Sequence, residues 1–491
     1  MTTQVEPVPV RVREAPAARE RRAWDVGVVA GPAALAVALC LYELSTRSLW
    51  LDEAATVAIA SQHGSALWSA MAHDGGNMLG YYALEHVLVG WFGTGAFAIR
   101  LPSLVAAGAC AGAVAFLALR LFDRRVALFA GLLAAVSLPL VFWGQDARGY
   151  APMMALVAGS FAAFAEVVEG PRRRGIGGAL IAYVACTVLS VYASYVAIFA
   201  LPAQLLLLAW RRNGAWRRVV GAIAVCAVCW IPLAVIAATR GSGQLFWISR
   251  PDLTSEKQVV LALTSAGFEP NFRPTAVAGV LAVVTVALLA FAAARLVRRR
   301  APWGVALALS WLLVPVVLMW LESLVGQPIF TARNLLVSLP AAALVVGWVL
   351  AQTQFAWPAL VVLIALRAVA LAPSYGTSPE NWRAATAFVV AGERPGDCVV
   401  FYPQDARMPF AYYTGKPVKP YIERYGTPRV PSSCARVWMV VSHQGQPTGP
   451  ATSRAHYATF VALRDSLARR YGHSVTKSFG YASVIWVQLF F

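Results

Sequence analysis

The sequence LWLDEAATVA (Leu49–Ala58) places an acidic pair, Asp52 and Glu53, directly after the first long apolar run of the chain. That run, residues 26–44, is long enough to span a bilayer and follows an N-terminus rich in arginine. Basic flanks tend to remain on the cytoplasmic side of a membrane. The sequence therefore predicts that Asp52 lies just outside the membrane, on the face opposite the N-terminus.

The composition is that of a polytopic membrane protein. Of 491 residues, 59% are hydrophobic and 13% are charged, and the mean hydropathy is +0.62. The net charge of +18 could suggest nucleic-acid binding. The arginines, however, are concentrated in short loops between apolar runs, where membrane topology alone explains them. We therefore expect no nucleic-acid partner.

Apolar runs of spanning length predict about eleven transmembrane helices. They lie near residues 26–44, 101–119, 126–143, 149–168, 176–192, 195–210, 219–237, 275–294, 303–321, 335–351 and 357–373. Four of the loops between them are arginine-rich, and all four fall on the same side as the N-terminus. This agreement predicts a cytoplasmic N-terminus and an extracytoplasmic C-terminal segment.

The chain divides into three parts. Residues 1–25 form a basic cytoplasmic tail, and residues 26–373 form a transmembrane domain with a long outer loop at 45–100. Residues 374–491 change in character: a helix capped by Ser378 and ending at Gly392 precedes a β-rich run, which predicts a small extracytoplasmic α/β domain. Cys398 and Cys434 lie there, where a disulfide is permitted, but the sequence leaves their pairing open.

Four polar clusters fall on the predicted outer side and are the candidates for chemistry. The first is the acidic pair. The other three are AHDGGNMLGYY (Ala72–Tyr82), VFWGQDARGYA (Val141–Ala151) and GQPIFTARNL (Gly326–Leu335). Charges at membrane ends are often solvated anchors, but an acid and an arginine held at membrane depth normally pair or bind a ligand. No His/Asp/Glu set has metal spacing, so neither a divalent metal nor another cofactor is indicated.

The order of these motifs resembles the GT-C fold glycosyltransferases that use polyprenyl-phosphate sugars. The match rests on WLDEA (Trp50–Ala54), RLPSLVAAG (Arg100–Gly108) and QDARGY (Gln145–Tyr150), and it covers residues 45–170 best. It is closest to the dolichyl-phosphate-mannose protein mannosyltransferase and lipid A aminoarabinose transferase group, and the tail is similar to that of actinobacterial mannosyltransferase-like members. The chain departs from the usual HPPLYY pattern, with HDGGNMLGYY at residues 73–82.

The resemblance implies a plasma-membrane enzyme that moves a sugar, with mannose favoured, from a polyprenyl-phosphate donor to an extracytoplasmic hydroxyl with inversion. Asp52 would be the general base and Glu53 its catalytic neighbour, because transfer needs a base for the acceptor hydroxyl. Cations must hold the departing phosphate, and guanidinium groups suit that task. Donor phosphate binding is assigned to Arg148 and Arg333, and substrate binding to His73, Asp74, Asn77, Tyr82, Gln145 and Asp146.

Two alternatives stay open at this level. A transporter or flippase for a lipid-linked sugar would share the polar clusters without catalysing transfer. An arabinofuranosyltransferase that uses polyprenyl-phosphate arabinose would share the chemistry with a different donor. The acceptor, whether glycan, glycolipid or protein, is not determined by the sequence.

Overall fold

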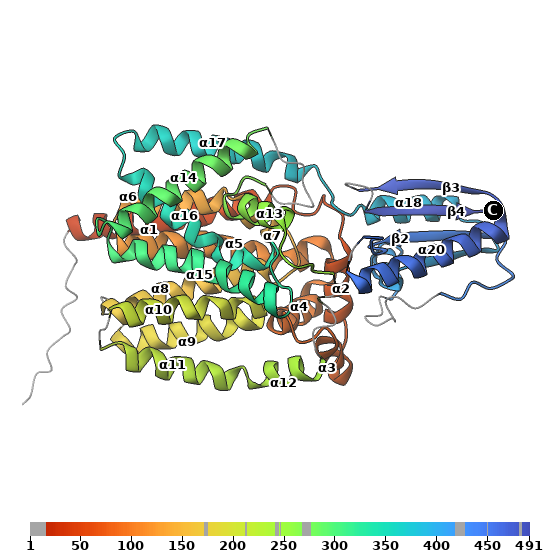
Figure 1. Cartoon of the computed structure of the whole chain (residues 1–491), viewed down its shortest axis with the longest axis horizontal. Helices are drawn as coiled ribbons and strands as arrows, with labels where there is room; N and C mark the ends of the chain where they lie inside the picture. Colours follow the sequence, from red (N-terminus) through yellow and green to blue (C-terminus); the bar gives the residue numbers. More distant parts are fainter. Residues whose placement is uncertain are drawn as a thin grey trace, which may run out of the picture.

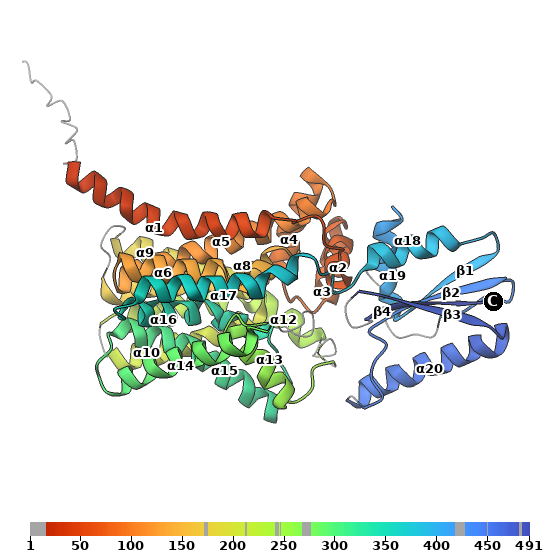
Figure 2. The same cartoon turned by 90° about the horizontal axis from the view of Figure 1, so that it is seen from above.

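The computed structural model describes residues 16–170, 175–211, 214–240, 245, 247–267, 276–417, 428–448, 450–480 and 484–491. A long helical bundle forms one part of the molecule, and a smaller α/β domain, here called the tail domain, lies against one end of it (Figures 1 and 2). The N-terminal end of α1 lies at the opposite end of the bundle.

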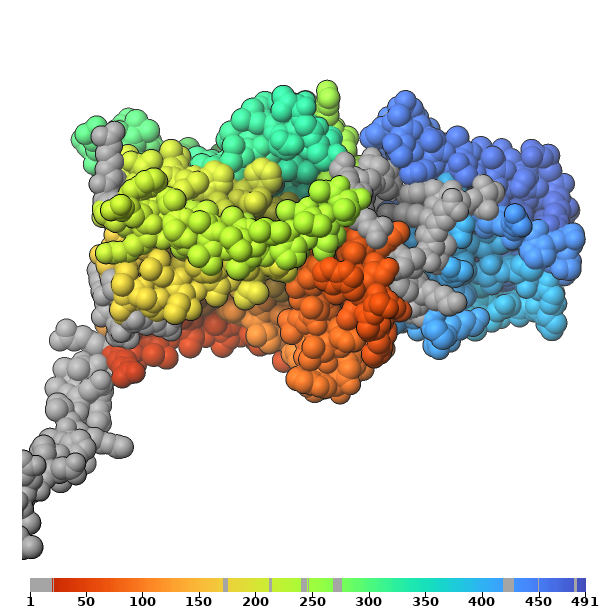
Figure 3. All heavy atoms as spheres, turned by 90° about the horizontal axis from the view of Figure 1, so that it is seen from below, coloured from red at the N-terminus to blue at the C-terminus, as the bar shows by residue number. Residues whose placement is uncertain are grey.

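The helices of the bundle are, in chain order, α1 (Pro16–Leu41), α2 (Leu51–Ala60), α3 (Gly64–His73), α4 (Leu79–Phe92), α5 (Ala96–Leu121), α6 (Arg124–Ala135), α7 (Leu138–Gly144), α8 (Tyr150–Glu169), α9 (Gly175–Ala193), η1 (Tyr195–Ala200), α10 (Leu201–Arg211), α11 (Trp216–Cys229), α12 (Ile231–Arg240), α13 (Leu253–Leu263), α14 (Ala278–Val297), α15 (Trp303–Val325), η3 (Asn334–Ser338), α16 (Leu339–Ala351) and α17 (Ala356–Tyr375). The short helices α2, α3 and α4 belong to the segment at residues 45–100 and gather at the end that faces the tail domain (Figure 1). The space-filling view shows these helices, in orange, as a block next to the blue tail domain (Figure 3).

The polytopic helical fold expected from the sequence is confirmed, with somewhat fewer spans than the eleven predicted. Within the described residues, eight helices are long and apolar enough to cross a membrane, or up to ten if each of two bent pairs counts as one span. The predicted span at 195–210 corresponds to Tyr195–Arg211, an apolar helical segment shorter than the eight. This difference accounts for the lower count.

One of the bent pairs carries part of the candidate site. Helices α6 and α7 are bent by 59° at residues 136–137. Pro139, in the first turn of α7, explains the break, because proline lacks a backbone N–H and its ring clashes with the carbonyl four residues before it. The bend directs α7 towards the turn at residues 145–149, which holds one of the polar motifs.

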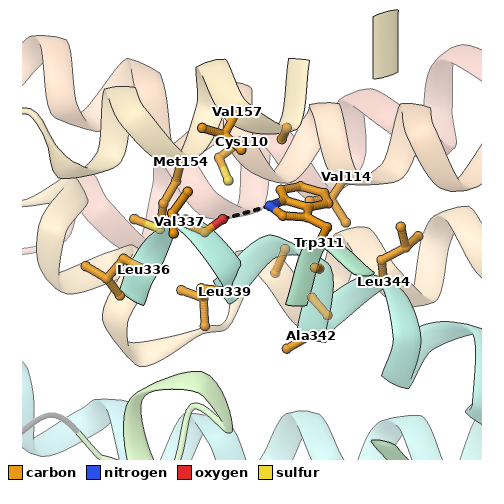
Figure 4. Packing of buried hydrophobic residues seen from close by; sticks show 14 of the residues in the cluster. Cys110, Val114, Met154, Val157, Trp311, Leu336, Val337, Leu339, Ala342 and Leu344 are labelled. Carbon is orange, nitrogen blue, oxygen red and sulfur yellow. Dashed lines mark hydrogen bonds between the residues drawn. The ribbon is translucent and has the colours of Figure 1, made fainter. Parts of the chain in front are cut away.

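A tightly packed core fixes the segment that follows Arg333. Trp311 of α15 stacks on Phe161 of α8 with ring centroids 4.3 Å apart, and its Nε1 donates to the Val337 carbonyl at 2.8 Å. Figure 4 shows this indole among side chains of α5, α8, η3 and α16. Because Val337 belongs to η3, the bond anchors the short helix that begins directly after Arg333.

The tail domain contains α18 (Trp382–Gly392), β1 (Asp397–Tyr402), η4 (Gln404–Ala406), α19 (Arg407–Tyr413), β2 (Arg436–Ser442), α20 (Ala451–Tyr471), β3 (Ser474–Phe479) and β4 (Ile485–Phe490). Its sheet has the order β1-β2-β4-β3, with β1 and β2 parallel and the other neighbours antiparallel. The small α/β domain expected from the sequence is thus confirmed. Within it, Cys398 and Cys434 form a disulfide. One detail differs from the prediction, since Asn381, not Ser378, caps α18 by accepting from the Ala384 N–H.

Candidate active site

Asp52 lies in the first turn of α2, where acidic side chains interact favourably with the helix dipole. Its Oδ2 is 3.6 Å from Nη2 of Arg148 and 3.7 Å from Nη1 of Arg333. The carboxylate side chain is 28% exposed. The structure therefore brings together three predicted site residues from parts of the chain that are far apart, and it leaves the carboxylate open to a ligand.

Arg148 is held from the other side by Tyr82 of α4. Its Nη1 donates to the Tyr82 hydroxyl at 2.8 Å, and that hydroxyl donates to Oδ2 of Asp74 at 2.6 Å. Burial raises the pKa of Tyr82 well above its usual range, so the hydroxyl keeps the proton that it donates. The Nε of Arg148 is buried and has no hydrogen-bond partner among the described residues. Arg148 thus keeps one unsatisfied donor in the interior of the site.

The turn that carries Arg148 fits closely against a neighbouring helix. A Cβ added at Gly149 would lie 2.2 Å from the Ala193 carbonyl oxygen at the end of α9. Only glycine allows this approach. This close contact fixes the start of α8, and with it Arg148, against the C-terminal end of α9.

Arg333 reaches the site from the segment before η3. Its guanidinium lies over the Trp247 ring, 4.5 Å from the ring centroid. Such a cation–π contact orients a guanidinium without using its N–H donors. The Arg333 side chain is 27% exposed, and its Nη1 lies 3.7 Å from Asp52 Oδ2, so part of the side chain is accessible to a ligand.

Glu53 differs from Asp52 although the two are adjacent in sequence. It is fully buried and accepts two bonds from Arg100, Nε to Oε1 at 2.7 Å and Nη2 to Oε2 at 2.6 Å. Its Oε1 also accepts from the Ala147 N–H at 3.0 Å. Both oxygens are therefore engaged with protein groups, and these bonds join α2 to α5 and to the 145–149 turn. The catalytic role of Glu53 stays a prediction.

Gln145 and Asp146, which were predicted to bind substrate, make hydrogen bonds with neighbouring protein groups. Gln145 Nε2 donates to the carbonyls of Cys40 and Tyr42, and these bonds cap the C-terminal end of α1. Asp146 is fully buried and accepts from Trp50 Nε1 at 2.7 Å. Burial, followed by the nearby Glu53 carboxylate, raises the pKa of Asp146 well above its usual range.

The remaining predicted residues lie on the 73–82 segment. His73 ends α3 and is exposed, next to Asp74. Asn77 Oδ1 accepts from the Tyr195 N–H at 3.2 Å, a contact that fastens the segment to η1. Within the described residues, no group of three His, Cys, Asp or Glu side chains is arranged to hold a metal ion.

Sequence reasoning missed two arginines that organise the site. Besides binding Glu53, Arg100 donates from Nη1 to the Leu44 carbonyl at 2.6 Å. Arg47 donates from Nη2 to the Gln145 carbonyl at 2.8 Å and lies 3.8 Å from Asp146 Oδ2. Arg100 begins the RLPSLVAAG motif (Arg100–Gly108). A single arginine within an apolar helix is a signal for a buried carboxylate partner, and it could have indicated this role.

Comparison with known proteins gives the same class as the motifs. Residues 78–237 match the family model of dolichyl-phosphate-mannose-protein mannosyltransferases. Among solved structures, ArnT from Cupriavidus metallidurans bound to undecaprenyl phosphate superposes with a TM-score of 0.58 at 13% identity, covering 94% of this chain and 98% of that one. Archaeal oligosaccharyltransferase AglB from Archaeoglobus fulgidus, in complex with an inhibitory peptide and a dolichol-phosphate, gives 0.56 at 14% identity, covering 94% and 74%. No curated protein shows a significant sequence match.

The resemblance stated from the sequence is thereby confirmed. The chain is a multi-pass membrane protein with the GT-C fold. The family match and the fold together support the expected enzyme class, a glycosyltransferase that depends on a lipid-linked sugar.

Proposed function

We propose that this enzyme transfers one sugar, with mannose favoured, from a polyprenyl-phosphate donor to an extracytoplasmic hydroxyl, with Asp52 as the general base. The observation that carries the proposal is the position of the Asp52 carboxylate, half-buried and facing the guanidinium groups of Arg148 and Arg333. A base next to two cations is what the reaction requires, since a proton leaves the acceptor while negative charge develops on the leaving phosphate.

Arg148 and Arg333 are proposed to bind the donor phosphate. At 3.6 and 3.7 Å their contacts with Asp52 are longer than hydrogen bonds, so N–H donors remain for phosphate oxygens. Guanidinium groups stay charged and can bind a phosphate through two parallel bonds. Tyr82 and Asp74 would hold Arg148 in the orientation that this requires.

In the proposed step, a bond forms between the acceptor oxygen and the anomeric carbon while the bond from that carbon to the phosphate oxygen breaks. The acceptor proton passes to Asp52, and polyprenyl phosphate leaves with its charge held by the two arginines. A single displacement of this kind inverts the anomeric configuration, by analogy with inverting glycoside chemistry. Glu53 serves only to orient the helix that carries Asp52.

The family match and the fold support the proposed donor. The matched family model is that of dolichyl-phosphate-mannose-protein mannosyltransferases, and this match favours mannose as the donor sugar. ArnT is recorded bound to undecaprenyl phosphate, which supports a polyprenyl-phosphate carrier. Arabinose remains the alternative sugar, because Asp52, Arg148 and Arg333 are assigned to the acceptor hydroxyl and the phosphate, which are common to hexose and pentose donors.

We also propose that the N-terminus is cytoplasmic and that the tail domain lies outside the plasma membrane. Three observations support this orientation. The arginine-rich loops alternate with the spans, the α2–α4 block and the tail domain share one end of the bundle (Figure 1), and the tail domain contains the Cys398–Cys434 disulfide. Disulfides persist in oxidising compartments, which favours the extracytoplasmic side.

The test uses the purified full-length protein in proteoliposomes with polyprenyl-phosphate mannose or polyprenyl-phosphate arabinose. Octyl mannoside and a serine-rich peptide serve as acceptor probes, and release of polyprenyl phosphate and the anomeric configuration of the product are measured. We expect release with the mannose donor and an inverted product. Movement of intact donor across the bilayer without release of polyprenyl phosphate would favour a flippase and contradict the proposal.

A further inference from the structure

The helix that carries Asp52 is capped by a residue of the tail domain. The first N–H groups of an α-helix have no partner within the helix. Trp50, at the N-cap of α2, makes no side-chain cap bond. In its place, Oε2 of Glu380 accepts from the N–H of Leu51, the first residue of α2, at 3.0 Å. A carboxylate at this position also interacts favourably with the helix dipole.

Glu380 is itself fixed within the tail domain. It is 3% exposed, and Oε2 also accepts from Trp382 Nε1 at 2.7 Å. Its other oxygen, Oε1, lies 3.3 Å from Nε2 of His443, at the end of β2. The Glu380 carboxylate is therefore held by three groups, two of which belong to the tail domain. Its position thus depends on the position of that domain relative to α2.

Other tail-domain residues hold the segment that leads into α2. The Tyr413 hydroxyl accepts from the Leu49 N–H at 2.7 Å, and Ser378 Oγ accepts from the Ser48 N–H at 3.0 Å. Met408 of α19 packs against Leu51, Ala54 and Ala58 on α2. Both the backbone before Asp52 and one face of its helix are thus in contact with the tail domain.

The first turn of α2 is consequently fixed from two sides. Glu53 joins it to Arg100 of α5 and to the Ala147 N–H in the bundle. Glu380 joins it to the tail domain through the Leu51 N–H. Asp52 lies between these two attachment points in sequence, so its direction depends on both.

We propose that Glu380 is a positioning residue for Asp52, and that the tail domain is a structural part of the active site. By completing the N-terminus of α2, Glu380 holds the Asp52 carboxylate towards Arg148 and Arg333. This inference rests on the proposed function of Asp52. It predicts that loss of the cap lowers the rate of the chemical step with little effect on donor binding, because the two arginines bind the phosphate without it.

The experiment compares Glu380→Ala, which removes the acceptor oxygen, with Glu380→Gln, which keeps one. Asp397→Ala is the matched control, because Asp397 is also a buried carboxylate of the tail domain but bonds to Arg436 and Trp438, away from α2. We expect kcat to fall about tenfold in Glu380→Ala with the donor KM within about threefold of wild type, and to recover in Glu380→Gln. Asp397→Ala should keep the wild-type kcat below its own unfolding temperature.

Hydrogen exchange gives a readout that is independent of activity. The amides of residues 51–56 should lose protection in Glu380→Ala and keep it in Asp397→Ala. If Glu380→Ala does not fold, Glu380→Met fills the same space without an oxygen acceptor and carries the same expectation. A folded Glu380→Ala or Glu380→Met variant with wild-type kcat, or an equal loss in Asp397→Ala, would overturn the proposal. Asp52→Asn is assayed in parallel, since an active Asp52→Asn enzyme contradicts the proposed function and not the cap alone.

Discussion

Glu53 and Arg100 form a buried ion pair with two parallel bonds, Nε to Oε1 at 2.7 Å and Nη2 to Oε2 at 2.6 Å, and neither side chain is exposed. The pair joins α2, the helix that carries the candidate base, to Arg100 in the second turn of α5. Asp52, the neighbour of Glu53, is left to face the two arginines of the open site.

The first prediction concerns this pair. Glu53→Ala leaves Arg100 charged, buried and without its carboxylate, which typically costs about 3–5 kcal/mol of stability. We expect a large fall in the unfolding temperature of the purified protein. Asp465→Ala, which removes a partly exposed partner of Arg464, should change stability by at most about 1 kcal/mol. Equal stability of the two variants would contradict the structural role of Glu53.

The second prediction concerns the phosphate. Arg148→Lys keeps a positive charge but loses the planar fork that can bind a phosphate through two parallel bonds. We expect kcat/KM for the donor to fall about tenfold or more, measured at limiting donor concentration.

A suitable control for Arg148→Lys is Arg120→Lys, because Arg120 pairs with Glu166 near the other end of α5 and lies far from Asp52. That variant should retain wild-type kinetics. An Arg148→Lys enzyme with unchanged donor KM and rate would refute the role of Arg148 in phosphate binding.

The third prediction is a pH dependence of stability that originates at Glu85 of α4. Glu85 is fully buried, and no cation pairs with it among the described residues. Burial raises its pKa from 4.5 to about 8, and the nearby Glu53 adds to the shift. A carboxyl group with a raised pKa in the folded state stabilises the fold fully below pH 4.5, and this contribution is lost as the pH rises through about 8.

The measurement is the unfolding temperature between pH 5 and pH 8.5. Over this range the wild-type protein should lose stability, because the unfolded chain releases the Glu85 proton more readily than the folded one. Glu85→Gln keeps a neutral side chain of the same shape, so its unfolding temperature should fall less. Parallel curves for the two proteins would show that Glu85 does not carry this proton.

Much of the architecture could be predicted from the sequence because apolar length and arginine placement are local signals. Each of the predicted spans falls on helical structure, and the difference in count comes from the short segment Tyr195–Arg211. The same motifs also predicted Asp52, Arg148 and Arg333 as site residues, and the structure places both guanidinium groups within 4 Å of the Asp52 carboxylate.

The direction of side chains at helix ends could not be predicted in this way. Gln145 and Asp146 precede Arg148 by only a few residues, yet they turn inward to α1 and Trp50. A sequence shows that such residues lie near the membrane surface but not which side of the turn they occupy. Glu380 was missed for a related reason, since it contacts Leu51 across 329 positions and no local pattern reports a contact of that range.

The most direct test of the account is the turnover of Asp52→Asn. Asparagine keeps the shape of the side chain and removes the base, so kcat should fall about 10²-fold or more, the usual size of a general-base contribution. Donor binding and the unfolding temperature should stay close to wild type, because Asp52 is half-buried and its contacts with both arginines are loose. A folded Asp52→Asn enzyme with near-native turnover, while Asp74→Asn or Glu53→Gln abolishes it, would show that another carboxylate is the base.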